Sequence, residues 1–354
     1  KWLPPDGDAD KKEITYTDGP ASKSSFMGFD GEHILYNSPH NQGRQVVILK
    51  PTGTSAEIPY QLIYFFHGQY GSIKNSFTTD LKNSISNIVA NQRQNVIIVM
   101  MNLGPKPDTG LVWDGSEGNN FNEFHSEVIT KINGEDSWKH TKEYKNDEGK
   151  IIETKISPVQ ISFITLKAFD TGGSAARRAI ENMTPQLKNK LQRIDFLEAS
   201  YGYEDPIIND PAGNYGLKFG EDVEFMLVAN PEFRKGEGDN SPWNRIKQYE
   251  GGKGPAGIKA IKSNKSHNKI PPFYFGLESN LFSPPLISAS KTVSPTLEPQ
   301  YSRQPKDGDP TDKNKQNHLP TTTGAGGYKE TANAYIRGYG LGKNINIKTF
   351  RKTK

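Results

Sequence analysis

Residues 161–203 read ISFITLKAFDTGGSAARRAIENMTPQLKNKLQRIDFLEASYGY, and they decide the predicted fold. Ile161–Phe169 is a short apolar run rich in β-branched and aromatic residues, which is typical of a buried strand. Residues 193–199 have the same character. Between the two runs, alanine, isoleucine and methionine recur at helical spacing among charged residues. A strand, a helix and a strand within about 40 residues match the size of one parallel βαβ unit.

The turn between the first strand and the helix is built from small residues. Asp170 and Thr171 are followed by Gly172, Gly173 and Ser174. Hydroxyl groups therefore lie where the chain passes from a strand into a helix, and a helix N-terminus stabilises a developing anion. Small residues around a hydroxyl at such a corner are typical of a nucleophile elbow, the sharp turn that exposes an attacking side chain.

The composition narrows the class of protein. The chain has 354 residues, of which 33% are hydrophobic, and a mean hydropathy of −0.73. These values indicate a polar chain with long loops, in one large domain or two ordinary ones, and no apolar run approaches the roughly 20 residues of a membrane span. The net charge is only +4 and the basic residues are scattered, so no nucleic-acid partner is predicted. The absence of cysteine excludes disulfides, thiolate metal sites and cysteine nucleophiles.

The start of the chain and two acidic clusters bear on localisation and cofactors. Lys1 opens directly onto Trp2 without a visible signal peptide, which fits a processed mature chain. We therefore expect a secreted or cell-surface protein, with the cytoplasm as the alternative. Residues 6–10 and 307–312 contain closely spaced carboxylates, but the first cluster has Lys11 where a calcium loop has glycine. We interpret both as solvated acidic turns and predict no metal and no cofactor.

Further strands and helices follow from the periodicity of the rest of the chain. Strands are predicted at residues 45–51, 60–66, 95–101, 223–229 and 272–276, and helices at 76–91, 121–129, 243–249 and 328–339. This alternation indicates an α/β fold, a doubly wound, mostly parallel sheet flanked by helices. We place this single domain at residues 45–354, after an irregular arm at 1–44. It carries a hairpin or mobile insertion at 133–158 and a long polar loop at 280–327.

A glycine-containing loop follows the predicted strand Tyr60–Phe66. Ligands of such sheets bind at the carboxyl ends of the strands, where the corner at residues 170–176 also lies. Backbone N–H groups in a loop of this kind can stabilise an oxyanion. We therefore predict an oxyanion or substrate-binding site formed by His67, Gly68, Gln69, Gly172 and Gly173.

With these residues in view, the chain resembles the α/β-hydrolase superfamily of esterases, lipases and peptidases. The matching segments are LIYFFHG (62–68), NVIIVMMN (95–102), FNEFHSEVITKI (121–132), the corner, and RIDFLEASYGY (193–203). They cover roughly residues 45–280. The resemblance implies the fold named above and a catalytic nucleophile, acid and histidine in that chain order.

The corner fits the family's nucleophile pattern in two registers. Residues 172–176 match it with Ser174 as the nucleophile. Residues 169–173 match it with Thr171 in place of serine, nearer the end of the strand. The β-branch of threonine restricts its first side-chain torsion and crowds a tight corner, so activity could be lost in that register. Both registers stay open.

The resemblance also implies an acid and a histidine. Glu198 ends the strand that follows the corner and is the first choice of acid, with Asp205, Glu232 and Glu237 as rivals. Two histidines lie downstream. His318 follows the last predicted strand, as the family's histidine does, whereas His267 precedes that strand and fits less well.

A second interpretation starts from the tripeptide Asp-Thr-Gly. It occurs at residues 108–110 and again at 170–172, and aspartic proteases pair two such aspartates around a shared proton. The two copies lie too close together in sequence for the two-lobed β fold of those enzymes, and the second runs into a helix. We therefore favour the α/β-hydrolase interpretation over the aspartic-protease one.

These residues predict a serine-type, or threonine-substituted, hydrolase that cleaves an ester or amide by acyl transfer. Ser174 or Thr171 would attack, His318 would move the proton, and Glu198 would orient the histidine. The partner would be a small-molecule, peptide or ester substrate. The alternative is a catalytically inactive relative that serves as an extracellular binding or structural assembly protein, since a fold does not imply a function.

Overall fold

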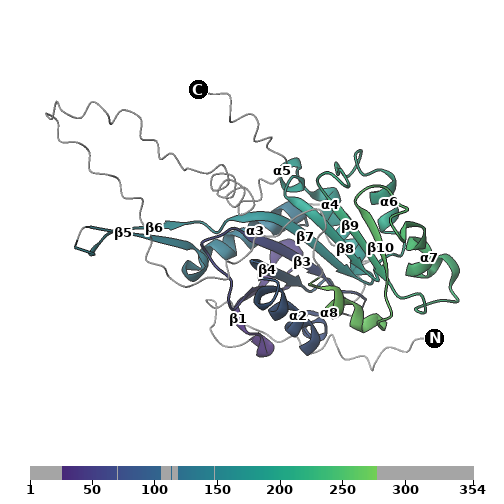
Figure 1. Cartoon of the computed structure of the whole chain (residues 1–354), viewed down its shortest axis with the longest axis horizontal. Helices are drawn as coiled ribbons and strands as arrows, with labels where there is room; N and C mark the ends of the chain where they lie inside the picture. Colours follow the sequence, from purple (N-terminus) through teal and green to yellow (C-terminus); the bar gives the residue numbers. More distant parts are fainter. Residues whose placement is uncertain (1–25, 70, 105–112, 114–118, 147, 277–354) are drawn as a thin grey trace, which may run out of the picture. The chain divides into compact units, whose positions relative to one another are not determined.

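The structure is a computed structural model that describes residues 26–69, 71–104, 113, 119–146 and 148–276 (Figure 1). All of these residues lie in the first of two compact units, which spans residues 1–287. The acidic clusters, the predicted polar loop at 280–327 and the predicted helix at 328–339 lie outside the described residues.

An eight-stranded sheet forms the centre of this unit. Its strand order is β1-β2-β4-β3-β7-β8-β9-β10. The strands are Gly31–Ser38 (β1), Arg44–Pro51 (β2), Tyr60–Phe66 (β3), Val96–Met101 (β4), Ile161–Phe169 (β7), Leu191–Leu197 (β8), Glu224–Ala229 (β9) and Ile258–Lys262 (β10). β2 runs antiparallel to both of its neighbours, and every pair from β4 to β10 is parallel. The predicted mostly parallel α/β sheet is confirmed.

Helices cover both faces of the sheet (Figure 1). They are Ile73–Ser76 (α1), Thr79–Ala90 (α2), Phe121–Gly134 (α3), Gly172–Asn182 (α4), Pro185–Lys188 (α5), Glu204–Asn209 (α6), Pro242–Ile246 (α7) and Ile270–Tyr274 (α8). Short 3-10 helices lie at Phe26–Gly28, Pro39–Asn41, Asp136–Trp138, Gly238–Asn240, Lys247–Tyr249 and His267–Lys269. The apolar sides of α3 and α4 join one large core cluster, and α2 joins a second cluster on the other face. Because both faces are covered, β4 is buried along its whole length and is apolar throughout.

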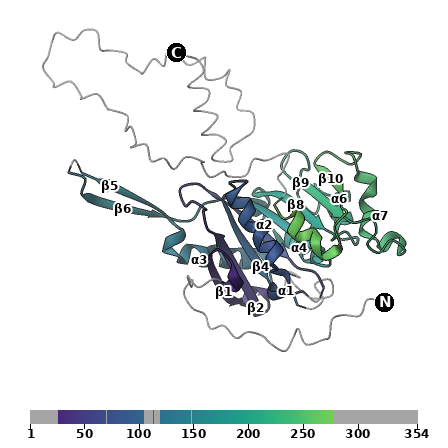
Figure 2. The same ribbon diagram turned by 60° about the horizontal axis from the view of Figure 1, so that its bottom comes forward.

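A second, two-stranded sheet projects from the unit. β5 (His140–Lys145) and β6 (Ile151–Ser157) pair antiparallel with each other and with no other described strand. Both views show this hairpin extending away from the eight-stranded sheet (Figures 1 and 2). This hairpin lies within residues 133–158, where we expect a hairpin or mobile insertion.

Three elements differ from their prediction. β1 lies inside residues 1–44, which we interpreted as an irregular arm, and β10 lies where no strand was predicted. β10 reads IKAIK and buries only alternate residues at its start, so it lacks the apolar run of a central strand. The predicted strand at 272–276 is wrong, because Pro271 and Pro272 occupy the first turn of helix α8, where N–H groups have no helical partner.

Charged side chains are buried inside the sheet next to the strand ends. Asp195 on β8 is fully buried and contacts the Lys167 ammonium on β7, while its other oxygen accepts from Arg193 Nε at 2.7 Å. Arg193 lies 3.8 Å from Glu224 on β9. Burial lowers the pKa of Lys167 to about 8. The carboxylate of Asp195 thus compensates two cations that have no access to water.

We expect Asp195→Ala to lower the free energy of unfolding by about 3–5 kcal/mol, because it leaves two buried cations without their shared carboxylate. Lys235→Ala is the matched control: it breaks the Lys235–Glu232 pair, whose side chains are 71% exposed, and should change the free energy by less than about 1 kcal/mol. Urea denaturation followed by circular dichroism measures both. Equal effects in the two variants would contradict the assignment of a structural role to the buried network.

Candidate active site

The corner after β7 presents Asp170 as its central residue. β7 ends at Phe169 and α4 begins at Gly172. Asp170 has a φ of 50°, in the left-handed region that non-glycine residues rarely adopt. A Cβ on Gly172 would lie 2.5 Å from the carbonyl oxygen of Phe66, so only glycine fits behind the turn. The strained, tightly packed corner predicted from the sequence is present, and a carboxylate occupies its tip.

Neither predicted hydroxyl nucleophile lies at the tip, because Thr171 directly precedes α4 and Ser174 lies inside it. Thr171 has helical backbone angles, and its hydroxyl is buried without a hydrogen-bond partner. Ser174 lies in the first turn of α4 and is only 2% exposed. Among the described residues, neither hydroxyl is hydrogen-bonded to a histidine. The geometry therefore favours neither Ser174 nor Thr171 as the attacking group.

The predicted oxyanion loop after β3 points at the Asp170 side chain. The Gln69 backbone N–H donates to Asp170 Oδ2 at 2.9 Å. A Cβ on Gly68 would lie 2.5 Å from Asp170 Cβ, so the loop backbone packs directly against this side chain. A backbone amide aimed at the corner residue is the arrangement expected of an oxyanion site. Here, however, its acceptor is the Asp170 carboxylate itself.

His67 holds this loop and does not act as a proton donor or acceptor for a substrate. Its Nδ1 bonds to the Gly68 carbonyl at 2.7 Å, and its Nε2 accepts from the Leu103 N–H at 2.9 Å. Nδ1 must carry the proton for both bonds to form, which defines a neutral tautomer. Burial lowers the pKa of His67 to about 4, in agreement with a ring that stays neutral. His67 therefore positions the Gly68–Gln69 backbone.

Glu198 and His267 form a hydrogen-bonded pair beside the corner. Glu198 directly follows β8 and has a φ of 55°. Its fully buried carboxylate accepts from the Asn230 N–H at 2.9 Å and lies 3.1 Å from His267 Nδ1. Glu198 thus orients the imidazole through Nδ1 and leaves Nε2 for proton transfer.

Register and ring stacking place this pair next to Asp170. Phe169, Leu197 and Val228 are aligned across β7, β8 and β9, so Asp170 and Glu198 leave adjacent strands at the same level. The His267 ring stacks on Phe233 at 4.1 Å and 9°, and it contacts the Phe169 ring at 4.6 Å with a tilt of 38°. The imidazole is therefore fixed between two aromatic rings, one of which directly precedes Asp170.

Tyr201 adds a phenol to the same edge of the sheet. Its hydroxyl is buried and interacts with the Asp170 carboxylate. Burial, followed by the negative charge of Asp170, raises the pKa of Tyr201 well above its usual range. The Arg234 guanidinium lies 5.2 Å from the centre of its ring. Tyr201 therefore stays protonated beside Asp170 and is able to donate a hydrogen bond.

The remaining predicted acids lie outside this arrangement. Asp205 is paired with Arg245, Glu232 with Lys235 and Glu237 with Arg234. His318 and the first Asp-Thr-Gly copy at 108–110 lie outside the described residues, so their predicted roles stay predictions.

The sequence gives two of these residues a lower rank. It places Asp170 before a hydroxyl nucleophile or in an aspartic-protease pair, although one register shift puts it at the centre of the small-residue pattern, between Ala168 and Gly172. His267 was ranked second because the strand at 272–276 was wrongly predicted to follow it. The last strand of the sheet is β10, and His267 comes just after it. The segment IKAIK was the sequence feature that could have indicated strand β10 before His267.

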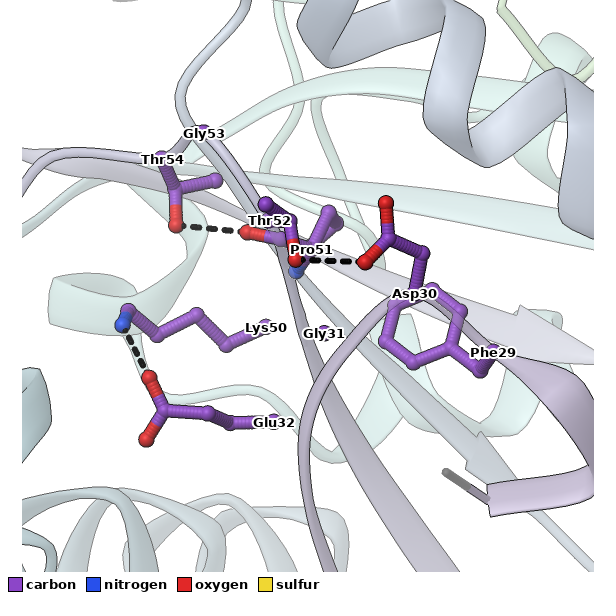
Figure 3. Close-up of a pocket in the computed structure, with 9 residues that line it drawn as sticks. All are labelled: Phe29, Asp30, Gly31, Glu32, Lys50, Pro51, Thr52, Gly53 and Thr54. Carbon is purple, nitrogen blue, oxygen red and sulfur yellow. Dashed lines mark hydrogen bonds and ion pairs between the residues drawn. The ribbon is translucent and has the colours of Figure 1, made fainter. Parts of the chain in front are cut away.

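A pocket of about 480 Å³ lies elsewhere on the unit (Figure 3). It is lined by Phe29, Asp30, Gly31, Glu32, Lys50, Pro51, Thr52, Gly53 and Thr54. Its walls come from the start of β1 and the end of β2. Because β2 is antiparallel to β4 and Val46 pairs with Met101, this end of β2 lies at the amino ends of the parallel strands. The pocket is thus at the opposite edge from Asp170.

The described residues contain no cluster of three or more histidine, aspartate or glutamate side chains arranged to hold a metal ion. None of their helices combines the length and the apolar character needed to cross a bilayer.

Comparison with known proteins finds likeness in structure alone. No protein-family model and no curated protein sequence matches the chain. Similar solved structures include an uncharacterised protein from Capnocytophaga ochracea, with 11% identity, a TM-score of 0.44, and coverage of 69% of this chain and 61% of that one. A feruloyl esterase module from Clostridium thermocellum complexed with sinapinate has 13% identity, a TM-score of 0.41, and coverage of 73% and 92%. For an S-formylglutathione hydrolase from Agrobacterium tumefaciens the values are 12%, 0.39, and 70% and 93%.

The chain thus spans less than two thirds of the first of these proteins. Its own architecture bears out the resemblance to α/β-hydrolases at the level of the fold. The sheet is mostly parallel with β2 reversed, and a strained corner joins β7 to α4. Glu198 and His267, which contact each other at 3.1 Å, both follow the corner along the chain. The roles of individual residues rest on this chain's geometry.

We expect Gly172→Ala to lower the free energy of unfolding by about 1–3 kcal/mol, because the added methyl group meets the carbonyl oxygens of Phe66 and His67 at 2.5 and 2.6 Å. Gly134→Ala is the control, since nothing lies within 4 Å of its added Cβ at the end of α3. That variant should be neutral or up to about 1 kcal/mol more stable. Thermal and urea unfolding measure both, and a neutral Gly172→Ala would contradict the tight corner.

We also expect stability to fall as the pH drops from about 6.5 to about 4. Burial lowers the pKa of both His67 and His125 to about 4 from 6.5, so in this window the unfolded chain binds more protons than the folded one. Each histidine then contributes a loss of about 1.4 kcal/mol per pH unit. His67→Asn should reduce the slope of unfolding free energy against pH by this amount. An unchanged slope would show that His67 is protonated in the folded protein.

Proposed function

We propose that this protein is a hydrolase in which the Asp170 carboxylate, rather than a hydroxyl group, is the nucleophile. The observation that carries the proposal is the position of Asp170. It occupies the strained tip of the corner, with a φ of 50°, and its Oδ2 accepts the Gln69 N–H at 2.9 Å. Carboxylates act as nucleophiles in covalent catalysis when a base is at hand for the second step.

The Gln69 amide supports attack on a saturated carbon. In acyl transfer, an oxyanion-site amide must bind the oxygen of the substrate carbonyl as it becomes negative. Here the amide already binds an oxygen of Asp170. It is therefore placed to stabilise negative charge that develops on Asp170 itself, when water adds to the side-chain carbonyl of an alkyl ester intermediate. The first step then needs no oxyanion on the substrate.

Two balanced steps follow from this arrangement. In the first, an Asp170 oxygen displaces a leaving group from carbon, so that a carbon–oxygen bond forms and the leaving group departs with its electron pair. In the second, His267 Nε2 takes a proton from water, and the oxygen of that water attacks Asp170 Cγ. The resulting oxyanion is stabilised by the Gln69 N–H. Its collapse expels the product alcohol, which takes the proton back from His267, and the restored carboxylic acid loses its proton to solvent.

The other groups of the site have roles that fit these steps. Glu198 holds the imidazole through Nδ1 and compensates its positive charge in the second step. Tyr201 keeps its proton beside Asp170 and can donate a hydrogen bond to an oxygen leaving group. Attack by Ser174 or Thr171 on an ester or amide is the competing mechanism, and it would need one of these buried hydroxyls to reach His267.

The test uses His267→Gln, which lets the alkyl ester form but slows its hydrolysis. We expect intact-protein mass spectrometry to show a stable adduct after incubation with a haloalkane or an epoxide, whereas a p-nitrophenyl ester in the same panel probes the competing acyl transfer. Peptide mapping should place the adduct on Asp170. His267→Gln combined with Asp170→Asn should form none, because the amide is not nucleophilic. We expect the second step to slow by about 10²–10⁴-fold in His267→Gln.

Two outcomes would contradict the proposal. An adduct on Ser174 or Thr171, removed by Ser174→Ala or Thr171→Val, would establish acyl transfer from a hydroxyl. An absence of both turnover and adducts across the panel would favour the binding or assembly protein that forms the alternative.

A further inference from the structure

The hairpin β5–β6 exposes a strand edge that no described strand covers. β6, Ile151–Ser157, pairs only with β5, and the hairpin extends away from the eight-stranded sheet in both views (Figures 1 and 2). An uncovered edge presents a row of backbone N–H and C=O groups that can pair with another strand. The side chains of β6 decide which strand that is.

β6 exposes several large apolar side chains. Its side chains from Ile151 to Ile156 are all exposed, and the exposed fractions of Ile151, Ile152 and Ile156 are 47%, 66% and 55%. Within the described part of the chain, most of the large exposed hydrophobic residues lie on this one strand. Concentrated exposed apolar residues on a strand edge mark a site of association.

The sequence of β6 is complementary to itself in the antiparallel direction. In a pair centred on Thr154, Glu153 of one copy lies opposite Lys155 of the other, and Lys155 lies opposite Glu153. Thr154 then lies opposite its own copy on the other side of the strands. Opposite charges are cross-strand neighbours that stabilise antiparallel sheets.

Neighbouring registers are excluded by charge. Backbone groups of a strand point alternately to its two edges, so two copies of β6 can pair only about a residue and not about a peptide bond. A pair centred on Glu153 puts two glutamates opposite each other, and one centred on Lys155 puts two lysines opposite each other. Only the register about Thr154 joins opposite charges. Ile152 is the extra residue at an irregularity of the β5–β6 pairing, whereas Glu153, Thr154 and Lys155 lie in its regular part.

We propose that β6 is the contact surface of a homodimer, in which two hairpins join edge to edge about a two-fold axis at Thr154 to form a four-stranded sheet. The contact follows the isologous rule of two-fold dimers, since residue 153 meets residue 155 in both directions. A single pair of short strands buries little surface, so the dimer is in equilibrium with the monomer and forms as concentration rises.

Charge reversal on β6 tests the proposal in the full chain. We expect the weight-average mass of the wild-type protein to rise from one chain towards two across a concentration series in sedimentation equilibrium. Glu153→Lys and Lys155→Glu each place like charges opposite each other, so each variant should stay at the mass of one chain. An equimolar mixture of the two variants should regain the wild-type rise, because each lysine then meets a glutamate.

Two controls make the outcome unambiguous. The double variant Glu153→Lys with Lys155→Glu exchanges the charges and should dimerise like the wild type. Lys235→Glu makes the same change of net charge as Lys155→Glu, but outside the hairpin, and should also dimerise. Circular dichroism checks that every variant is folded. A wild-type chain that stays monomeric, single variants that dimerise unchanged, or a mixture that stays monomeric would overturn the proposal.

Discussion

The hydrogen bond from the Gln69 backbone to the Asp170 carboxylate is the interaction on which the site depends. It joins two loops that leave neighbouring parallel strands, β3 and β7. For it to form, the corner must bring the two backbones into contact, which requires glycine at positions 68 and 172. The left-handed conformation of Asp170 follows from the same turn. Local strain at this point is stabilised by the packed sheet around it and is typical of functional sites.

Around this contact, buried charged side chains are compensated in two different ways. Within the sheet, Lys167, Arg193 and Asp195 satisfy one another and face no open site. At the strand ends, the carboxylates of Asp170 and Glu198 are each held by a backbone amide instead, from Gln69 and Asn230. Backbone donors stabilise a carboxylate without adding a cation. The one basic side chain bonded to either carboxylate is, among the described residues, the imidazole of His267 on Glu198, which suits a group that must gain and lose a proton.

The sequence predicted the sheet and the location of the corner because both depend on local patterns. Apolar runs mark the buried strands, and the small residues after Phe169 mark a tight turn into a helix. Glu198 followed from its place at a strand end. Asp170 was not predicted as the tip residue, since the elbow pattern usually carries a hydroxyl there and the aspartate was considered only as half of an aspartic-protease pair. His267 was ranked below His318 because β10, which is short and partly charged, was not predicted as a strand. Residues 272–276, which overlap helix α8, were predicted as the last strand instead. Neither the pairing of Glu198 with His267 nor the contact of Gln69 with Asp170 has a local signature, because each joins residues far apart in the sequence.

The central claim is that the Asp170 side chain exchanges an oxygen with water in every catalytic cycle. Turnover in water enriched in oxygen-18, followed by mass spectrometry of the peptide that contains Asp170, measures this exchange. A nucleophilic carboxylate is attacked at its own Cγ, so we expect the label to accumulate in Asp170 during repeated turnover, and the first product molecules to carry the unlabelled oxygen of the enzyme. Label in the first product and none in Asp170 would show that water attacks the substrate or an intermediate on another residue, and would contradict the account.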